Sequence, residues 1–207
     1  MITVKRIAVL ALITISFITM NAKKSYIFLA PGVEEIEATS TIDAMRRAQI
    51  PVVTVAVDTT LMIKGATGQT VVADSLLSDI DTSDADWLIV PGGMPGAPNL
   101  HASTTVNDML LAHFAKGGRI ASICAGPAIV LAPLGILKGK TATCYPGIGD
   151  KIDENGGTYV KEPVVVDGNI ITSEGPGTTL KFAKAIICAT VGMQKADETM
   201  ASMLADD

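Results

Sequence analysis

The sequence predicts an α/β fold, in which helices cover both faces of a doubly wound and mainly parallel sheet. Three observations lead to this prediction. Short apolar runs alternate with longer segments of helical composition, which is the pattern of strands joined by crossover helices. The run at residues 87–90 is continuously apolar and that at residues 52–57 is apolar except for Thr54, as in parallel strands that are buried on both faces. Three of the runs end in turns rich in glycine and proline.

Five apolar runs are expected to form strands. They cover residues 25–30, 52–57, 87–90, 120–123 and 141–145. Two further segments are expected to fold back on themselves. Residues 61–74 contain Gly65 and Gly68, which favour a hairpin or an irregular excursion. Residues 164–173 are split by Asp167-Gly168-Asn169, which predicts a hairpin turn.

Helices are expected between the strands because these segments carry helical composition and recognisable end signals. They cover residues 33–48, 104–115, 178–191 and 196–204, with a further helix starting at Pro127 and a helix or turn at residues 150–152. The first has acidic residues in its first turn and Arg46-Arg47 in its last, which matches the helix dipole. The second stops at Gly117-Gly118.

Residues 1–22 form an apolar N-terminal segment before a single domain at residues 23–207. Lys5 and Arg6, followed by an apolar stretch, resemble a secretory signal, but bulky Met20 stands where the cleavage site needs a small residue. The alternative is an over-extended reading frame with the true start at Met20. We expect the start at Met20 and a cytoplasmic protein, and export directed by residues 1–22 is the alternative. The stretch is too short and too weakly apolar to predict a membrane span.

Composition indicates an ordinary globular domain and excludes one class of partner. The chain has 207 residues, of which 48% are hydrophobic and 18% charged, so it can bury an ample core. Its formal net charge of −5 argues against nucleic-acid binding, which needs a basic surface. Three scattered cysteines make neither a disulfide framework nor a Cys-x-x-Cys metal site.

Cys124 is the candidate nucleophile because of its place in Gly-Gly-Arg-Ile-Ala-Ser-Ile-Cys-Ala-Gly-Pro, residues 117–127. The apolar run before it predicts a buried strand, and Gly126 and Pro127 predict a turn into a helix. Such a turn lifts a nucleophile above the sheet edge, and a helix N-terminus favours thiolate over thiol. The alternative is a buried cysteine that only fills space.

The other cysteines and both histidines are not expected to do chemistry. Cys188 lies in an apolar helical stretch and Cys144 follows a predicted strand, so packing roles are expected for both. His101 and His113 have polar neighbours and are expected at the surface. None of these residues has metal-site spacing, and the sequence predicts no bound metal.

Two glycines and three acidic residues complete the candidate site. Backbone N–H groups at Gly92 and Gly93 could approach a carbonyl oxygen closely, although a plain turn is the alternative. Glu34 and Glu35 are expected to form a solvated first helical turn. Glu37 lies three residues after Glu34 and is expected to face inward, where burial and a nearby thiolate would raise its pKa.

Four ordered segments of the chain resemble the ThiJ/PfpI superfamily, in the branch of the Parkinson-linked protein deglycase (DJ-one). The resemblance extends from about Lys24 to Gly192. Each segment alone is weakly specific, but the four in this order are highly specific. They are Gly32-Val33-Glu34-Glu35-Ile36-Glu37-Ala38, Val90-Pro91-Gly92-Gly93, Ala121-Ser122-Ile123-Cys124-Ala125-Gly126-Pro127 and Thr172-Ser173-Glu174-Gly175-Pro176-Gly177-Thr178.

The resemblance implies a flavodoxin-like fold, homodimers and a set of site residues. It matches Cys124 to the family's nucleophilic, oxidation-sensitive cysteine and Glu37 to its partnering glutamate. Gly93, Cys124 and Ala125 match the backbone donors of the site. Together with Gly92, they form the expected oxyanion or substrate-binding site.

Three positions depart from the family's pattern. Ala125 stands where protease-like members carry His directly after the nucleophile, and Tyr145 stands where several deglycase relatives carry His before a proline. Tyr is a poor base near neutral pH, so no Cys-His dyad is expected, proton transfer falls to Glu37, and Tyr145 is expected to bind substrate. Glu174 replaces the family's basic residue before Gly-Pro-Gly-Thr, so anion binding and dimer contacts there are not carried over.

The leading hypothesis is a cofactor-free enzyme of glyoxalase or deglycase type, acting on small reactive dicarbonyls such as methylglyoxal or on their adducts. The alternative is a redox sensor or chaperone-like stress protein, in which Cys124 is oxidised to a sulfinic acid stabilised by Glu37. A cysteine peptidase or amidase is third, and the absent His counts against it. The expected partners are a small carbonyl substrate and a second copy of the chain, without nucleic acid or stable membrane association.

Overall fold

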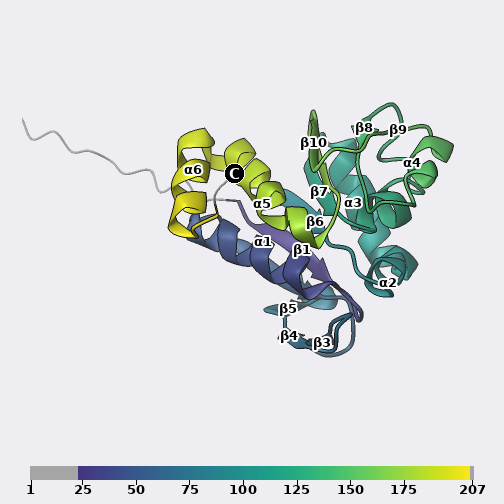
Figure 1. Ribbon diagram of the computed structural model, residues 1–207. Coiled ribbons are helices and arrows are strands. Elements are labelled where there is room, and N and C mark those ends of the chain that lie inside the picture. Colours follow the sequence, from purple (N-terminus) through teal and green to yellow (C-terminus); the bar gives the residue numbers. More distant parts are fainter. Residues whose placement is uncertain (1–22, 206–207) are drawn as a thin grey trace, which may run out of the picture.

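The computed structural model describes residues 23–205 (Figure 1). The segment at residues 1–22, with both alternatives for its role, lies outside the described residues. Within residues 23–205, no helix combines the length and the apolar character needed to cross a membrane.

A seven-stranded sheet forms the centre of the fold and confirms the predicted α/β class. Its order is β10-β11-β7-β6-β1-β2-β5, and all neighbours are parallel except the edge strand β10, which pairs antiparallel with β11. The strands are β1 (Ser25–Leu29), β2 (Val52–Ala56), β5 (Ser75–Leu76), β6 (Trp87–Val90), β7 (Arg119–Ile123), β10 (Val164–Asp167) and β11 (Ile170–Ser173). Every residue of β1 and β6 is buried, as expected for central parallel strands.

Two layers of helices cover the sheet. The first layer, in front of the strands in Figure 1, contains α1 (Glu35–Arg47), α5 (Thr179–Val191) and α6 (Met193–Ser202), which contact one another. The second layer contains α2 (Gly96–Ala102), α3 (Thr104–Ala115) and the π-helical turn η2 (Pro127–Leu131). The predicted helix after Cys124 is thus one π-helical turn, which starts at Pro127.

Both predicted hairpins are confirmed. Residues 61–74 contain the antiparallel pair β3 (Met62–Lys64) and β4 (Thr70–Val72), and β10 and β11 join through Gly168. Gly168 has φ of +61°, a conformation that glycine adopts without strain.

The expected strand at residues 141–145 is wrong in its length and its partner. Only Thr141–Ala142 is a strand, β8, and it pairs with β9 (Thr158–Tyr159) in a separate two-stranded sheet beside α4 (Asp150–Glu154). The backbone N–H of Tyr145 instead donates to the Cys124 carbonyl oxygen at 2.8 Å. Beyond β8, the N–H of Thr143 donates to the Thr172 hydroxyl of β11 at 2.9 Å, and the chain then bonds to the residue that follows β7. The sequence reasoning also missed the short elements α2, β5 and β9, and the 3-10 turns η1 (Leu77–Asp79) and η3 (Pro176–Thr178).

Candidate active site

Three strand ends meet at one edge of the sheet. Strands β1, β6 and β7 are neighbours, so the turns that follow them lie together, as predicted. The N–H of Glu34, just before α1, donates to the Gly92 carbonyl oxygen at 3.2 Å. The N–H of Gly92 donates in return to Glu37 Oε2 at 2.8 Å. These two bonds join the turn after β1 to the turn after β6.

Cys124 occupies a strained turn between β7 and η2. Its φ of +62° lies in the left-handed region, which is costly for a residue with a side chain and recurs at active sites. Its N–H donates to the Ser173 carbonyl oxygen at 2.9 Å, which fixes the turn against β11. A Cβ at Gly92 would lie 2.6 Å from Cys124 Cβ. Only glycine therefore fits beside the thiol.

Glu37 points inward and is fully buried, as predicted. Glu34 caps the helix by accepting a hydrogen bond from the Glu37 N–H at 2.7 Å, which orients the first turn of α1. Oε2 of Glu37 is held by Gly92, whereas the buried Oε1 has no N–H or O–H partner among the described residues. Burial raises the pKa of Glu37 to about 7, although its contacts with Cys124 and the Gly92 N–H act against this rise and the Glu34 charge adds to it.

The backbone donors at the helix end favour a Cys124 thiolate, as expected, but other effects outweigh them. Burial first, and then the charge and hydrogen bond of Glu37, raise the pKa of Cys124 to about 12, although the N–H groups of Gly93 and Ala125 act to lower it. Desolvation and a neighbouring carboxylate together outweigh the backbone donors. Because Cys124 and Glu37 interact directly, they titrate as a pair.

The backbone donors of the predicted oxyanion site have different roles. The N–H groups of Gly93 and Ala125 lower the pKa of the Cys124 thiol, so they are directed toward the sulfur. The Gly92 N–H is already bound to Glu37, so Gly92 positions the carboxyl group and has no free donor for a ligand.

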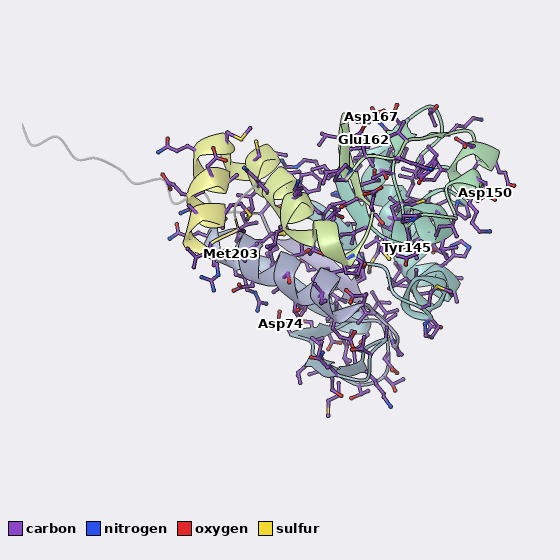
Figure 2. All side chains as sticks on the ribbon, viewed as in Figure 1. Asp74, Tyr145, Asp150, Glu162, Asp167 and Met203 are labelled. Carbon is purple, nitrogen blue, oxygen red and sulfur yellow. The ribbon has the colours of Figure 1, made fainter. Side chains whose placement is uncertain are left out.

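Tyr145 lies at the mouth of the site, and its position is marked in Figure 2. Its side chain is 51% exposed. A Cβ built at Gly175 would lie 3.4 Å from the Tyr145 ring, so the ring rests beside the turn that follows β11. Its backbone N–H reaches the Cys124 carbonyl oxygen, as described above. The backbone of Tyr145 therefore supports the nucleophile, and the ring lies near incoming ligand.

Tyr145→Phe is expected to lower kcat/KM for a dicarbonyl substrate by at most about tenfold, the worth of one hydrogen bond. The substitution keeps both the ring and the backbone bond to Cys124. Steady-state kinetics on the folded variant checks this. A loss of about 10² to 10⁴, typical of a general acid–base group, would instead make the hydroxyl catalytic.

Glu35 is not the solvated residue that the sequence suggested. It is only 3% exposed, and its carboxylate accepts hydrogen bonds from the N–H and hydroxyl of Thr67 and from the N–H of Gln69. Burial acts to raise the pKa of Glu35, but these bonds outweigh it and lower the pKa. Glu35 thus fixes the β3–β4 loop to the start of α1.

The predicted surface position of His113 is also wrong. The side chain is buried, and Nε2 lies 3.1 Å from the Arg119 carbonyl oxygen at the start of β7, the opposite end of that strand from Cys124. His101 lies on α2 and is half-buried. The packing role of Cys144 fits its complete burial, whereas Cys188 is only half-buried. Within residues 23–205, no cluster of three or more His, Cys, Asp or Glu side chains could hold a metal ion.

Comparison with known protein families supports the same interpretation. The model of the DJ-1/PfpI family matches residues 23–189. The chain belongs to the DJ-1/PfpI family. This confirms the resemblance inferred from the four sequence segments, all of which fall within the matched residues.

The DJ-1 relatives include both curated proteins and solved structures. The chain is 38% identical over 176 residues to protein DJ-1 homolog A of Arabidopsis thaliana, covering 85% of this chain and 45% of the relative. It is 36% identical to the glutathione-independent glyoxalase DJR-1.2 of Caenorhabditis elegans, covering 87% and 96% of the two chains. The structure of oxidized Toxoplasma gondii DJ-1 matches with a TM-score of 0.85 at 36% identity, over 90% of this chain and all of that one.

The length of the relatives limits what can be transferred to this chain. It spans less than half the length of the two DJ-1 homologs of Arabidopsis thaliana that it matches. The match shows a domain of the DJ-1/PfpI family.

Proposed function

We propose that this protein is a cysteine-dependent, cofactor-free enzyme that converts small dicarbonyls such as methylglyoxal, or their adducts, into hydroxy acids. One observation carries the proposal. A buried carboxyl group with a pKa near 7, Glu37, is held against Cys124 in a turn that also presents the N–H groups of Gly93 and Ala125. A general base works best when its pKa lies near the operating pH. The name of the Caenorhabditis elegans relative supports the same chemistry.

The first step is addition of Cys124 to the aldehyde. Ionised Glu37 accepts the thiol proton while the sulfur bonds to the aldehyde carbon, which matters because the thiol's own pKa is about 12. The aldehyde oxygen becomes negative as the carbonyl opens, and the N–H groups of Gly93 and Ala125 are the donors placed to stabilise it. Glu37 then gives the thiol proton to the new alkoxide oxygen, so the product is a hemithioacetal and Glu37 is ionised again for the next step.

The second step moves a proton between the two adjacent carbons of the substrate. Glu37 takes the proton from the carbon that carries sulfur and returns a proton to the neighbouring carbon, which leaves a thioester on Cys124. Water then hydrolyses the thioester and restores the thiol. The net change is addition of one water to methylglyoxal to give lactate, with no oxidant, reductant or cofactor consumed.

The test is methylglyoxal consumption without glutathione, with lactate measured as the product. Wild type should turn over, Cys124→Ser should lose about 10³-fold or more, and the matched control Cys188→Ser should keep its activity. Equal activity of wild type and Cys124→Ser would reject the proposal.

A redox sensor is the second candidate, and Glu37 gives a specific reason for it. Its buried Oε1 has no N–H or O–H partner among residues 23–205, so a protonated Glu37 could donate to an oxygen added to Cys124. The similar Toxoplasma gondii structure carries the word oxidized in its title. The redox sensor would be favoured if peroxide treatment added two oxygen atoms to Cys124 and the same protein did not consume methylglyoxal. A peptidase or amidase is less well supported, because His113 lies at the other end of β7.

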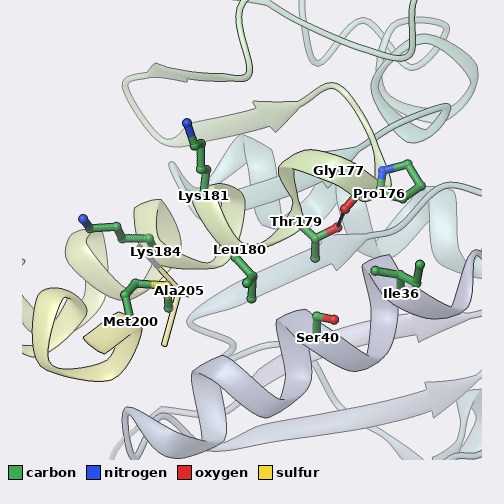
Figure 3. A pocket seen from close by; sticks show the side chains of 10 residues that line it. All are labelled: Ile36, Ser40, Pro176, Gly177, Thr179, Leu180, Lys181, Lys184, Met200 and Ala205. Carbon is green, nitrogen blue, oxygen red and sulfur yellow. Dashed lines mark hydrogen bonds between the residues drawn. The ribbon is translucent and has the colours of Figure 1, made fainter. Parts of the chain in front are cut away.

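The oligomeric state is also a proposal. Ile36 lies next to Glu37 on α1 and is 53% exposed, which is unusual for a large apolar side chain inside a site motif. It borders a pocket of about 290 Å³ between α1 and α5 (Figure 3), which Leu180 and Met200 also line. We propose that a second copy of the chain covers Ile36 and this pocket, so that the working form is a homodimer.

Ile36→Glu is expected to convert the dimer into a monomer, because an unpaired charge would be buried in the interface. Light scattering coupled to size-exclusion chromatography measures the mass. The matched control is Val166→Glu on the edge strand β10, since Val166 is 59% exposed but lies outside the pocket. A wild type that runs as a monomer at micromolar concentration would contradict the prediction.

A further inference from the structure

We infer that Glu174 is a specificity-determining residue of the Cys124 site, which makes the site favour uncharged and cationic carbonyl compounds over those that carry a carboxylate. This inference rests on the proposed function where it concerns substrate turnover. It depends on where Glu174 sits and on the sign of the charges around it.

Backbone contacts place Glu174 at the mouth of the site. The residue before it, Ser173, accepts the Cys124 N–H at 2.9 Å. The residue after it, Gly175, lies beside the Tyr145 ring. Since Tyr145 also donates its N–H to Cys124, both neighbours of Glu174 are fixed to the reactive turn. Its side chain is half-buried.

The Glu174 carboxylate is free to act on a ligand. It makes no hydrogen bond or ion pair with other side chains in the described part of the chain, and only its backbone N–H is used, by the Pro163 carbonyl oxygen at 3.3 Å. Burial is the main cause of the raised pKa values of Cys144 and Tyr159. The negative charge of Glu174 adds to both shifts. Cys144 is the chain neighbour of Tyr145.

The other charges that act on the site are negative as well. Glu34 acts on Glu37 from the first turn of α1. Asp150 and Asp153 of α4 act on Cys144, next to Tyr145. Each charged side chain that perturbs Glu37, Cys144 or Tyr159 from within residues 23–205 is thus acidic.

This arrangement discriminates between substrates by charge. We infer that a ligand whose aldehyde carbon reaches Cys124 extends past Tyr145 and Glu174, because the backbone on either side of Glu174 contacts the Cys124 turn and the Tyr145 ring. A carboxylate beside Glu174 meets like charge, whereas an amine or guanidinium group meets opposite charge. The chemical class favoured is therefore a neutral dicarbonyl or a carbonyl adduct with a cationic remainder.

Two pairs of probes test the inference. The catalytic pair is phenylglyoxal and 4-carboxyphenylglyoxal, which differ by one carboxylate, compared by kcat/KM. The second pair is iodoacetamide and iodoacetate, compared by their rates of alkylation at Cys124, read by mass spectrometry and normalised to free cysteine. The second pair needs no turnover.

Glu174→Gln should reduce the preference for the neutral probe by about threefold to fivefold in each pair, and Glu174→Lys by about tenfold. The matched control is Glu198→Gln, which removes the same charge from the exposed side of α6 and should leave both ratios at the wild-type value. Alkylation ratios unchanged in both Glu174 variants would overturn the inference.

The two arms separate this inference from the proposed function. If the wild type turns over neither glyoxal but Glu174→Gln still shifts the alkylation ratio, the proposed reaction fails and the charge selectivity stands. If the wild type turns over phenylglyoxal and neither ratio moves in the variants, the reaction stands and the role of Glu174 is rejected.

Discussion

Glu37→Gln is expected to lower methylglyoxal turnover by at least about 10²-fold while Cys124 remains open to oxidation. Gln keeps the size of Glu and can still accept the Gly92 N–H that now binds Oε2 at 2.8 Å, so the fold and the position of the side chain are retained. It cannot accept the thiol proton or carry a proton between carbons. The measurement is kcat, together with the mass of Cys124 after peroxide treatment.

A matched control separates loss of the proton carrier from loss of charge. Glu198→Gln makes the same chemical change on the exposed side of α6 and should keep wild-type activity. If Glu37→Gln retained most of its activity, Glu37 would have no part in the reaction. If Cys124 in Glu37→Gln resisted peroxide, the variant would have damaged the turn itself.

The same variant should change how stability depends on pH. The folded pKa of Glu37, about 7, is above its ordinary value of 4.5. The folded state therefore favours the protonated carboxyl, and this contribution is fully present below pH 4.5 and is lost as pH rises through 7. Its size is about 3 kcal/mol. Between pH 4.5 and 8, the difference in unfolding free energy between wild type and Glu37→Gln should therefore change by about 3 kcal/mol.

Gly93→Ala is expected to destabilise the fold by roughly 3 kcal/mol or more. Gly93 has φ of +95°, and a Cβ there would lie 2.3 Å from the Gly32 carbonyl oxygen and 2.4 Å from the Glu34 nitrogen. Both contacts are backbone atoms, which cannot move aside as a flexible side chain can. In urea unfolding, the midpoint should fall by at least about 1 M.

Gly177→Ala provides the control for that prediction. Gly177 is exposed, and an added Cβ would meet no atom within 4 Å. Its stability should stay within about 1 kcal/mol of wild type. Equal midpoints for the two variants would mean that the close approach of the β1 and β6 turns is not needed for stability.

The sequence predicted the parts of this structure that depend on local pattern. Continuous apolar runs located the central strands, and the parallel arrangement then required their ends to meet. Glu37 was expected to face inward, and its side chain is fully buried. The family segments pointed to the same residues independently.

The features that the sequence could not predict depend on contacts between distant residues. Glu35 is buried because Thr67 and Gln69, more than thirty residues away, supply its hydrogen bonds. His113 is buried because Arg119 offers a carbonyl oxygen beside the ring. The pKa of Cys124 is high because the thiol is buried beside Glu37. From the sequence alone, only the helix N-terminus after Cys124 could be recognised, and its N–H groups lower the pKa.

The central claim is that Cys124 and Glu37 form one buried pair in which the carboxyl group is half protonated near neutral pH. Infrared difference spectroscopy across a pH titration measures this most directly, because the protonated and ionised carboxyl groups absorb separately, and subtraction of the Glu37→Gln spectrum isolates Glu37. We expect its midpoint near pH 7, with a shift in Cys124→Ser because the thiol contact is changed. A midpoint near 4.5 that is unchanged in Cys124→Ser would contradict the claim.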